Sequence, residues 1–262
     1  RRPPRSTQSR SSAASDVYKR QPFVLFGTIH LFSLALIFLI VIGLPYAANR
    51  SSDAKKDFIT KTIAFLLLFH AVASPYQQLF ILENPYHWKE VLPFHMCDFS
   101  EIILAWFLLG GPKILFNIAY FWGIAGATMA LLTPDVTVGG DLDYILFFAG
   151  HGVIVIGVFY AILTLGNLPT LKDTHQVILI TIFALLPIIY AINVILGDFA
   201  PYGIDPGGVT NYWYLMAKPD GDSLLNLFPP PPGHILPSLL ITVCLFYLIY
   251  LPIGIKNKLN NR

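Results

Sequence analysis

Seven apolar stretches dominate this chain and constrain its fold more than any other feature. They cover about residues 22–46, 58–82, 93–109, 113–133, 142–166, 175–196 and 233–255. A helix needs about 20 consecutive apolar residues to cross the hydrocarbon core of a bilayer. Charged residues make up 12% of the chain, against about 25% in soluble domains. The sequence therefore predicts an all-α membrane protein, a bundle of about seven transmembrane helices in one domain over residues 21–262.

Residues 1–20 differ in composition from everything that follows. They are rich in Arg and Ser and low in apolar residues. We expect a non-native or disordered leader here and exclude it from the reasoning on fold and topology. The alternative is a short basic arm that touches anionic lipid.

The basic residues of the loops predict an orientation in the membrane. With residues 1–20 set aside, one set of alternate loops holds nine Lys and Arg residues, and the other holds only Lys89 and Lys218. Cytoplasmic loops carry an excess of Lys and Arg. We therefore expect the N-terminus outside and the C-terminus in the cytoplasm, which gathers most polar side chains of the helices in the outer half of the bilayer. This orientation depends on the exclusion of the leader, because the leader holds six further basic residues.

The stretch Leu92-Pro93-Phe94-His95-Met96-Cys97-Asp98, followed by Phe99-Ser100-Glu101, is the candidate active site. Proline suits the first turn of a helix because its missing N–H would be unpaired there. The stretch therefore places a histidine, a thiol and two carboxylates in the first turns of the third predicted helix. Ionisable residues at membrane depth are expensive and indicate function.

Helical geometry divides these four groups between two faces. His95 and Asp98 share one face, where the carboxylate can orient or charge the imidazole, and Cys97 and Glu101 share the other. Cys97 is the candidate nucleophile, although a cysteine can also be a simply packed apolar residue. His95 points about 160° away from it, so a base for Cys97 must come from another helix. His95 can instead bond a backbone carbonyl at the helix end.

His151 is the best candidate for that base. It lies within the fifth apolar stretch between Gly150 and Gly152, where glycines let another backbone or a substrate approach closely. A cysteine and a histidine from separate helices supply the nucleophile and the base of covalent acyl transfer. We therefore predict Cys97 and His151 as catalytic residues, with His95, Asp98 and Glu101 in supporting roles.

A polar segment before the last predicted helix supplies candidates for substrate or headgroup contacts. They are Asn211, Tyr212, Lys218 and His234. An amide and an ammonium group can bind a phosphate, and aromatic residues suit the membrane interface. The alternative is a solvated loop without a ligand.

Other site chemistries have weaker support. His70, His95, Asp98, His151 and His234 could converge on a metal, but no helical His-x3-His spacing appears and we predict no metal site. Signatures of P-loop, dinucleotide and nucleic-acid binding are absent from the sequence, so we expect no cofactor and no nucleic-acid partner. Membrane lipid is the expected partner. The two cysteines, Cys97 and Cys244, are expected at different depths, which disfavours a disulfide.

Several motifs in order resemble a known family. They are Leu92-Pro93-Phe94-His95-Met96-Cys97, Phe121-Trp122-Gly123, Ala130-Leu131-Leu132-Thr133-Pro134-Asp135, Phe147-Phe148 with His151, and Asn211-Tyr212 with Lys218-Pro219. Over roughly residues 25–250 the chain resembles the YwaF family of bacterial integral membrane proteins. That family is similar to the transmembrane protein 164 family, described as acyltransferases that place polyunsaturated acyl chains on ether phospholipids. The resemblance implies a multi-pass protein of the cell membrane, with Cys97 as catalytic cysteine and His151 as catalytic histidine.

Three functions are thus open from the sequence. The first is a lipid acyltransferase or acyl hydrolase that uses Cys97 and His151. The second is a non-enzymatic membrane protein that binds or transports a small polar or lipid ligand. The third is a zinc-dependent seven-helix lipid hydrolase.

Overall fold

A computed structural model describes residues 22–82, 86–134, 136, 138–197, 210–218 and 224–260. In these residues the chain is helical, and the only β-type pairing is an isolated bridge between Pro22 and Val138. The all-α prediction is therefore confirmed. The predicted leader, residues 1–20, lies outside the described residues, as does Asp135.

The helices follow the order of the apolar stretches. They are α2 (Thr28–Asn49), α3 (Asp53–Phe80), α4 (Met96–Leu108), α5 (Lys113–Trp122), the π-helix η1 (Gly123–Ala127), α6 (Thr128–Leu132), α7 (Leu142–Leu163), α8 (Leu171–Ile180), the π-helix η2 (Thr181–Leu185), α9 (Leu186–Leu196) and α10 (Ile235–Asn260), with the short 3-10 turns η3 (Tyr212–Tyr214) and η4 (Leu224–Leu227). The segments α5, η1 and α6 are continuous, and so are α8, η2 and α9.

Six of the resulting helices are long and apolar enough to cross a membrane. They correspond to all of the predicted spans except the third, which is α4. This helix has 13 residues, a length of about 20 Å, so it is shorter than the hydrocarbon core of about 30 Å. The chain is thus a multi-pass membrane protein in which the short helix α4 carries the candidate nucleophile.

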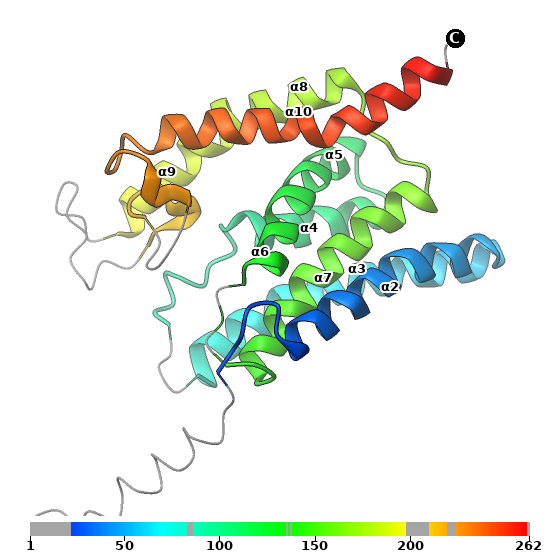
Figure 1. Ribbon diagram of the computed structural model, residues 1–262, viewed down its shortest axis with the longest axis horizontal. Coiled ribbons are helices and arrows are strands. Elements are labelled where there is room, and N and C mark those ends of the chain that lie inside the picture. Colours follow the sequence, from blue (N-terminus) through cyan, green and yellow to red (C-terminus); the bar gives the residue numbers. More distant parts are fainter. Residues whose placement is uncertain are drawn as a thin grey trace, which may run out of the picture.

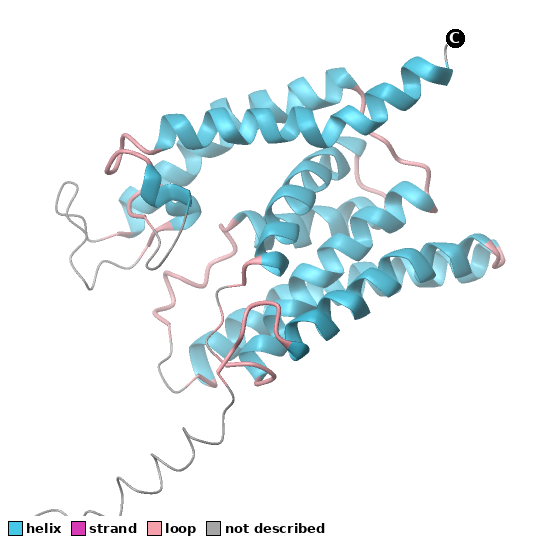
Figure 2. Cartoon of the chain, in the orientation of Figure 1, coloured by secondary structure: helices cyan, strands magenta, loops and turns pink. Residues whose placement is uncertain are grey.

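The helices form three groups, and α7 contacts members of two of them. Figure 1 shows α8 and α10 side by side above, α2 and α3 with α7 below, and α4, α5 and α6 between them. α7 contacts α2, α3, α4, η1 and α6. Figure 2 shows the loops that precede α4, α7 and α10 at the same end of the bundle. This arrangement brings the beginnings of α4 and α7 to one end of the molecule.

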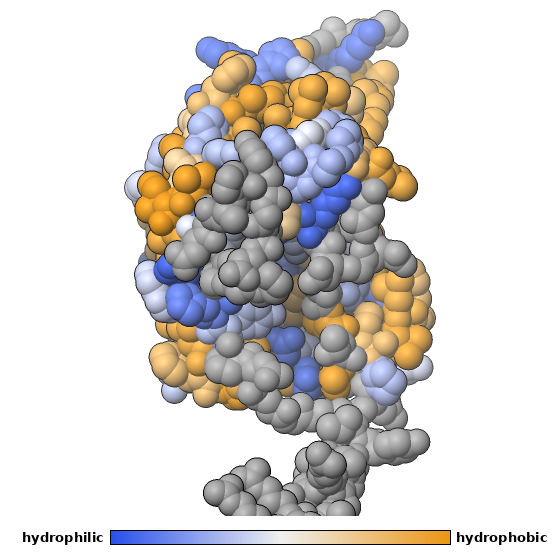
Figure 3. Space-filling view, turned by 90° about the vertical axis from the view of Figure 1, so that its left-hand side faces the viewer, coloured by the Kyte–Doolittle hydropathy of each residue, from blue (hydrophilic) through white to orange (hydrophobic). Residues whose placement is uncertain are grey.

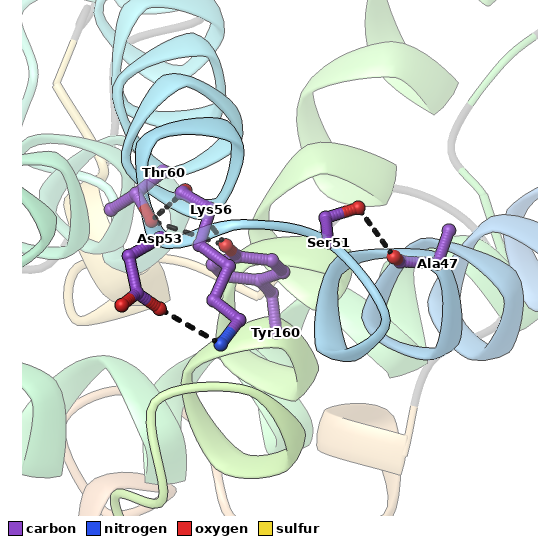
Figure 4. Close-up of polar contacts among 6 residues, drawn as sticks. All are labelled: Ala47, Ser51, Asp53, Lys56, Thr60 and Tyr160. Atoms are coloured by element: carbon purple, nitrogen blue, oxygen red, sulfur yellow. Dashed lines mark hydrogen bonds and ion pairs between the residues drawn. The ribbon is translucent and has the colours of Figure 1, made fainter.

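A glycine contact and hydrogen bonds hold α7 against its neighbouring helices. A Cβ atom at Gly123 of η1 would lie 2.9 Å from Cγ2 of Ile154 on α7, so only glycine permits this approach. At the far end of α7, the hydroxyl of Tyr160 donates to the Lys56 carbonyl at 3.0 Å and lies 3.2 Å from the Thr60 hydroxyl (Figure 4). These contacts fix the depth of α7 against both η1 and α3.

The two π-helices interrupt long helices at different kinds of position. η2 directly precedes α9, whose first turn contains Pro187, a residue without an N–H to continue the regular bonding. η1 contains Gly123 and Gly126 and no proline. π-Helical turns are rare, and those that occur are frequently found at functional sites. The residues around η1 are therefore candidates for a functional site.

Apolar side chains cover much of the outer surface, as a lipid environment requires. The exposed large apolar residues of α10 include Leu236, Leu240, Leu248 and Leu251. The end of the molecule seen in Figure 3 differs, because hydrophilic residues gather in the middle of that face between apolar regions above and below.

Candidate functional site

The helix that carries Cys97 begins later than the sequence predicts. Pro93 does not lie in its first turn: α4 starts at Met96, and His95 is the N-cap residue with extended backbone angles (φ −69°, ψ 153°). The Phe94 carbonyl accepts a hydrogen bond from the Trp213 indole at 2.9 Å. A loop residue from far along the chain therefore takes a carbonyl that a longer helix would have used.

The later start moves Cys97 to the second position of α4. The first helical hydrogen bond of this turn runs from the Phe99 N–H to the His95 carbonyl at 3.0 Å. The N–H groups of Met96, Cys97 and Asp98 precede it and have no carbonyl partner within the helix. Cys97 is free and partly exposed, and its Sγ lies 3.9 Å from the position that a Cβ would take at Gly126 of η1. The thiol thus faces the glycine backbone of the π-helix.

Glu101, one turn further along α4, is paired with a histidine from α3. Nδ1 of His70 lies 2.7 Å from Oε1 of Glu101, and the two side chains are 13% and 3% exposed. Oε2 of Glu101 is buried without a hydrogen-bond partner among the described residues. A buried carboxylate needs a partner such as His70, because an isolated charge is expensive away from water.

The second nitrogen of His70 fixes how the proton of this pair is shared. Nε2 lies 2.9 Å from the Leu146 carbonyl on α7, and a carbonyl only accepts, so Nε2 carries a hydrogen. One further proton is shared between Nδ1 and the Glu101 carboxyl. The pair is either imidazolium with carboxylate or neutral imidazole with carboxylic acid. It has no net charge in either form.

His70 occupies space that only a glycine on α7 leaves open. A Cβ atom at Gly150 would lie 2.1 Å from Cε1 and 2.5 Å from Nε2 of His70. The ring therefore lies against the α7 backbone one residue before His151. Together, the contacts of His70 with Glu101 and with Leu146 link the helix of Cys97 to the helix of His151.

His151 has the hydrogen bonding that a general base requires. Its Nδ1 lies 2.8 Å from the Phe147 carbonyl one turn back on α7, so Nδ1 carries the hydrogen and Nε2 carries the lone pair. The Phe147 ring packs beside the imidazole with centroids 4.4 Å apart. These two contacts hold the ring in one orientation and one tautomer.

The predicted pairing of the His95 and Asp98 side chains is wrong. The His95 ring packs edge-on against Tyr212, with centroids 4.8 Å apart. Asp98 lies in the first turn of α4, where a carboxylate interacts favourably with the positive end of the helix dipole. The physical reason is the packing of the His95 ring on Tyr212, a long-range contact that local helix geometry does not predict.

The four predicted headgroup residues hold a loop in place. The Asn211 amide donates to the Ala217 carbonyl at 2.9 Å and accepts from the N–H groups of Met216 and Ala217 at 3.0 Å each. The Lys218 ammonium donates to the Phe228 carbonyl at 2.5 Å. His234 is buried, and its Nε2 lies 2.7 Å from the Tyr214 carbonyl.

Tyr212 connects this loop to the entry of α4. Its hydroxyl donates to the Lys89 carbonyl and accepts from the Leu92 N–H at 3.2 Å. Its backbone N–H and carbonyl both bond the side chain of Asn193 on α9. Burial raises the pKa of the Tyr212 phenol, so the group stays a neutral hydroxyl. Through Tyr212, the loop thus contacts His95 and holds the segment that precedes α4.

The residue that the sequence reasoning missed is His70. The sequence alone indicates it only as one of several possible metal ligands. Its position offered a signal, since a histidine within an apolar span needs a partner at the same depth. Glu101 could have been identified as that partner from the depths of the two helices, but only if α3 and α4 were known to be neighbours.

No metal centre is formed by the described residues. Among them, no three His, Cys, Asp or Glu side chains gather closely enough to hold an ion. His70 and His234 use a ring nitrogen to bond backbone carbonyls in separate parts of the molecule. The zinc-dependent hydrolase therefore lacks a ligand set in this part of the chain.

Comparisons with known proteins place the chain among membrane proteins of one family. A family model described as the TMEM164 family matches residues 25–250. An uncharacterized protein of Treponema pallidum (strain Nichols) is 30% identical over 130 residues, which are 48% of this chain and 52% of that protein. The chain thus spans about half the length of this curated relative. No solved structure matches the chain.

Proposed function

The chain belongs to the TMEM164 family, and on that premise we propose that it is a lipid acyltransferase or acyl hydrolase of the cell membrane. Cys97 is the nucleophile and His151 the base. The observation that carries the proposal is the hydrogen bonding of His151, because its Nδ1 is engaged with the Phe147 carbonyl and its Nε2 is left with a lone pair. The family membership and the multi-pass fold support a lipid substrate.

The first half of the reaction forms a thioester. Sγ of Cys97 attacks the carbonyl carbon of a lipid ester, and its proton passes to Nε2 of His151. The ester C–O bond then breaks, and the leaving alcohol takes the proton from His151. The acyl group is left on Cys97.

The second half releases the acyl group. A hydroxyl of an acceptor lipid, or a water molecule, gives its proton to Nε2 and attacks the thioester carbonyl. The C–S bond breaks, and the thiol recovers the proton from His151. An acceptor lipid gives transfer and water gives hydrolysis, and neither step needs an oxidant or a metal ion.

The start of α4 can stabilise the oxyanion of both steps. The N–H groups of Met96, Cys97 and Asp98 lack helical partners and point out of the positive end of the helix dipole. Donors of this kind, aimed at a developing negative charge, make the largest contribution in many acyl-transfer enzymes. Burial of the Cys97 side chain disfavours a resting thiolate, and the neighbouring Asp98 carboxyl adds to this effect. Cys97 therefore needs a base during the attack.

The remaining residues of the site act by position. His70 joins the helices of the nucleophile and the base, and His95 with Tyr212 holds the turn before α4. A lipid headgroup would meet the loop segments that hold Asn211, Lys218 and His234. The side chains of these residues already bond backbone groups, so fewer of their donors and acceptors are left for a headgroup.

A trapping experiment tests the proposal. Full-length protein in lipid nanodiscs is incubated with phospholipid that carries a radiolabelled acyl chain, and the label on protein is mapped to peptides before and after hydroxylamine. We expect a hydroxylamine-sensitive acyl group on the Cys97 peptide and none on the Cys244 peptide. His151→Gln should lose the label, while His175→Gln, an exposed histidine at a distance from the site, should keep it.

Two outcomes would overturn the proposal. One is lipid turnover that is unchanged in both Cys97→Ser and His151→Gln. The other is the absence of turnover and of a trapped acyl group in folded wild-type protein, with phospholipid still bound. The second result would favour the non-enzymatic protein that binds or transports a lipid ligand.

A further inference from the structure

An apolar groove lies between the η1–α6 segment and α10, on membrane-spanning helices. Its volume is about 540 Å³. Residues of η1 and α6, including Ala125, Thr128 and Met129, form one wall, and residues of α10, including Leu240, Cys244 and Leu248, form the other. The groove thus runs along two helices that both cross the membrane.

The chemistry of the walls excludes a polar ligand. Apart from the Thr128 hydroxyl and the Cys244 thiol, the residues that line the groove are aliphatic or Met. Neither a phosphate nor an ion finds a charged partner there. A ligand that comes from the bilayer is already in an apolar medium, so it gains binding energy by close packing against the walls.

The size and position of the groove point to a hydrocarbon chain. A hydrocarbon chain needs no polar partner along its length, which matches walls that offer almost none. An extended acyl chain is much narrower than a helix. The groove is also continuous with the lipid-facing surface, because Leu240 and Leu248 are 60% and 61% exposed and Met129 is 55% exposed. Acyl chains surround this surface in the bilayer.

The groove shares one helical segment with the candidate nucleophile. Ile124 and Ala125 of η1 line the groove, and Gly126, the next residue, faces Sγ of Cys97. A change in the position of η1 would therefore alter both the groove and the surroundings of the Cys97 thiol. A ligand held against Ala125 and Thr128 packs on the same turn that forms the wall beside the thiol.

We propose that the groove between η1–α6 and α10 binds one acyl chain of a membrane lipid. The lipid lies with this chain along α10 and against the π-helix η1, and the proposal does not depend on whether Cys97 becomes acylated. Binding requires no covalent step.

Photocrosslinking in nanodiscs tests this site with the full-length protein. The probe is a phosphatidylcholine with a diazirine in the middle of one acyl chain, diluted into unlabelled phosphatidylcholine, and crosslinked peptides are identified by mass spectrometry. We expect enrichment on the peptides that contain Ala125–Met129 and Leu240–Leu248. Excess unlabelled phospholipid should reduce this enrichment, because a bound chain is held longer than bulk lipid.

A groove-filling variant and a matched control sharpen the test. Cys244→Trp should lower the crosslink on the η1 peptide severalfold, because the indole takes the space that the acyl chain would occupy. Leu251→Trp places the same ring on an exposed position of α10 outside the groove and should leave the crosslink unchanged. Circular dichroism of both variants establishes that they are folded.

Two results would overturn the proposal. One is an equal crosslink in Cys244→Trp and wild-type protein. The other is a Cys244–Cys244 crosslink between two copies with loss of lipid labelling, since a second copy would then cover the groove. Cys97→Ser should keep the lipid crosslink, so failure of the acyl-transfer mechanism and failure of the groove are distinguishable.

Discussion

Nδ1 of His70 on α3 lies 2.7 Å from Oε1 of Glu101 on α4, and the same ring bonds the Leu146 carbonyl on α7. One side chain therefore ties together three helices around the candidate site. Cys97, the proposed nucleophile, lies one turn before Glu101, and His151, the proposed base, lies five residues after Leu146 and next to Gly150. The relative placement of the two catalytic candidates depends on this contact.

Removal of one partner of the pair is expected to destabilise the protein strongly. His70→Ala leaves the Glu101 carboxyl buried with neither oxygen paired, at a cost of about 3–5 kcal/mol. Thermal unfolding in detergent measures the loss. The double variant His70→Ala with Glu101→Leu should be more stable than His70→Ala alone, because no carboxyl is then stranded. Additive effects within about 0.5 kcal/mol would show that the two side chains are not coupled.

Gly150→Ala should displace the His70 ring. The new methyl group would lie 2.1–2.6 Å from ring atoms of His70, and overpacking of this kind costs roughly 1–3 kcal/mol. Gly43→Ala on α2 is the matched control, because nothing lies within 4 Å of its Cβ position. The control should be neutral or stabilised by up to about 1 kcal/mol. Equal melting temperatures for the two variants would contradict the placement of His70.

Asn193→Ala is expected to release the loop over residues 210–218. The Asn193 side chain bonds both the N–H and the carbonyl of Tyr212, at 2.8 and 2.9 Å. Both backbone groups would be left buried without a partner, at a cost of about 1–3 kcal/mol. Limited proteolysis should then cut this loop faster. Asn49→Ala, which removes one exposed hydrogen bond, serves as the control and should leave the cleavage rate unchanged.

Tyr212 predicts a dependence of stability on alkaline pH. Its pKa in the folded protein is raised by burial, while the unfolded chain has the ordinary value of about 10. Above that pH the unfolded chain loses the phenol proton first, so the free energy of unfolding falls as the pH rises. Tyr212→Phe lacks this effect. The stability advantage of wild-type protein over Tyr212→Phe should therefore shrink as the pH rises above about 10, and a constant difference would contradict a buried neutral phenol.

The sequence by itself determined the class of fold and the main candidates for chemistry. Hydropathy is a local count over about 20 residues, so each predicted span has a helix in the structure. The family resemblance, carried by short motifs, is confirmed by the match over residues 25–250. The orientation of the termini and the catalytic roles of Cys97 and His151 stay predictions.

Only the tertiary structure decided which side chains meet. The start of α4 depends on Trp213, which takes the Phe94 carbonyl from more than a hundred residues away. The partner of Glu101 is His70 on another helix, and His95 packs on Tyr212 instead of pairing with Asp98. The helical period fixes which residues share a face, because it is a local property of the backbone. The rotation of each helix about its axis, and the neighbour that it faces, are set by packing between segments distant in sequence.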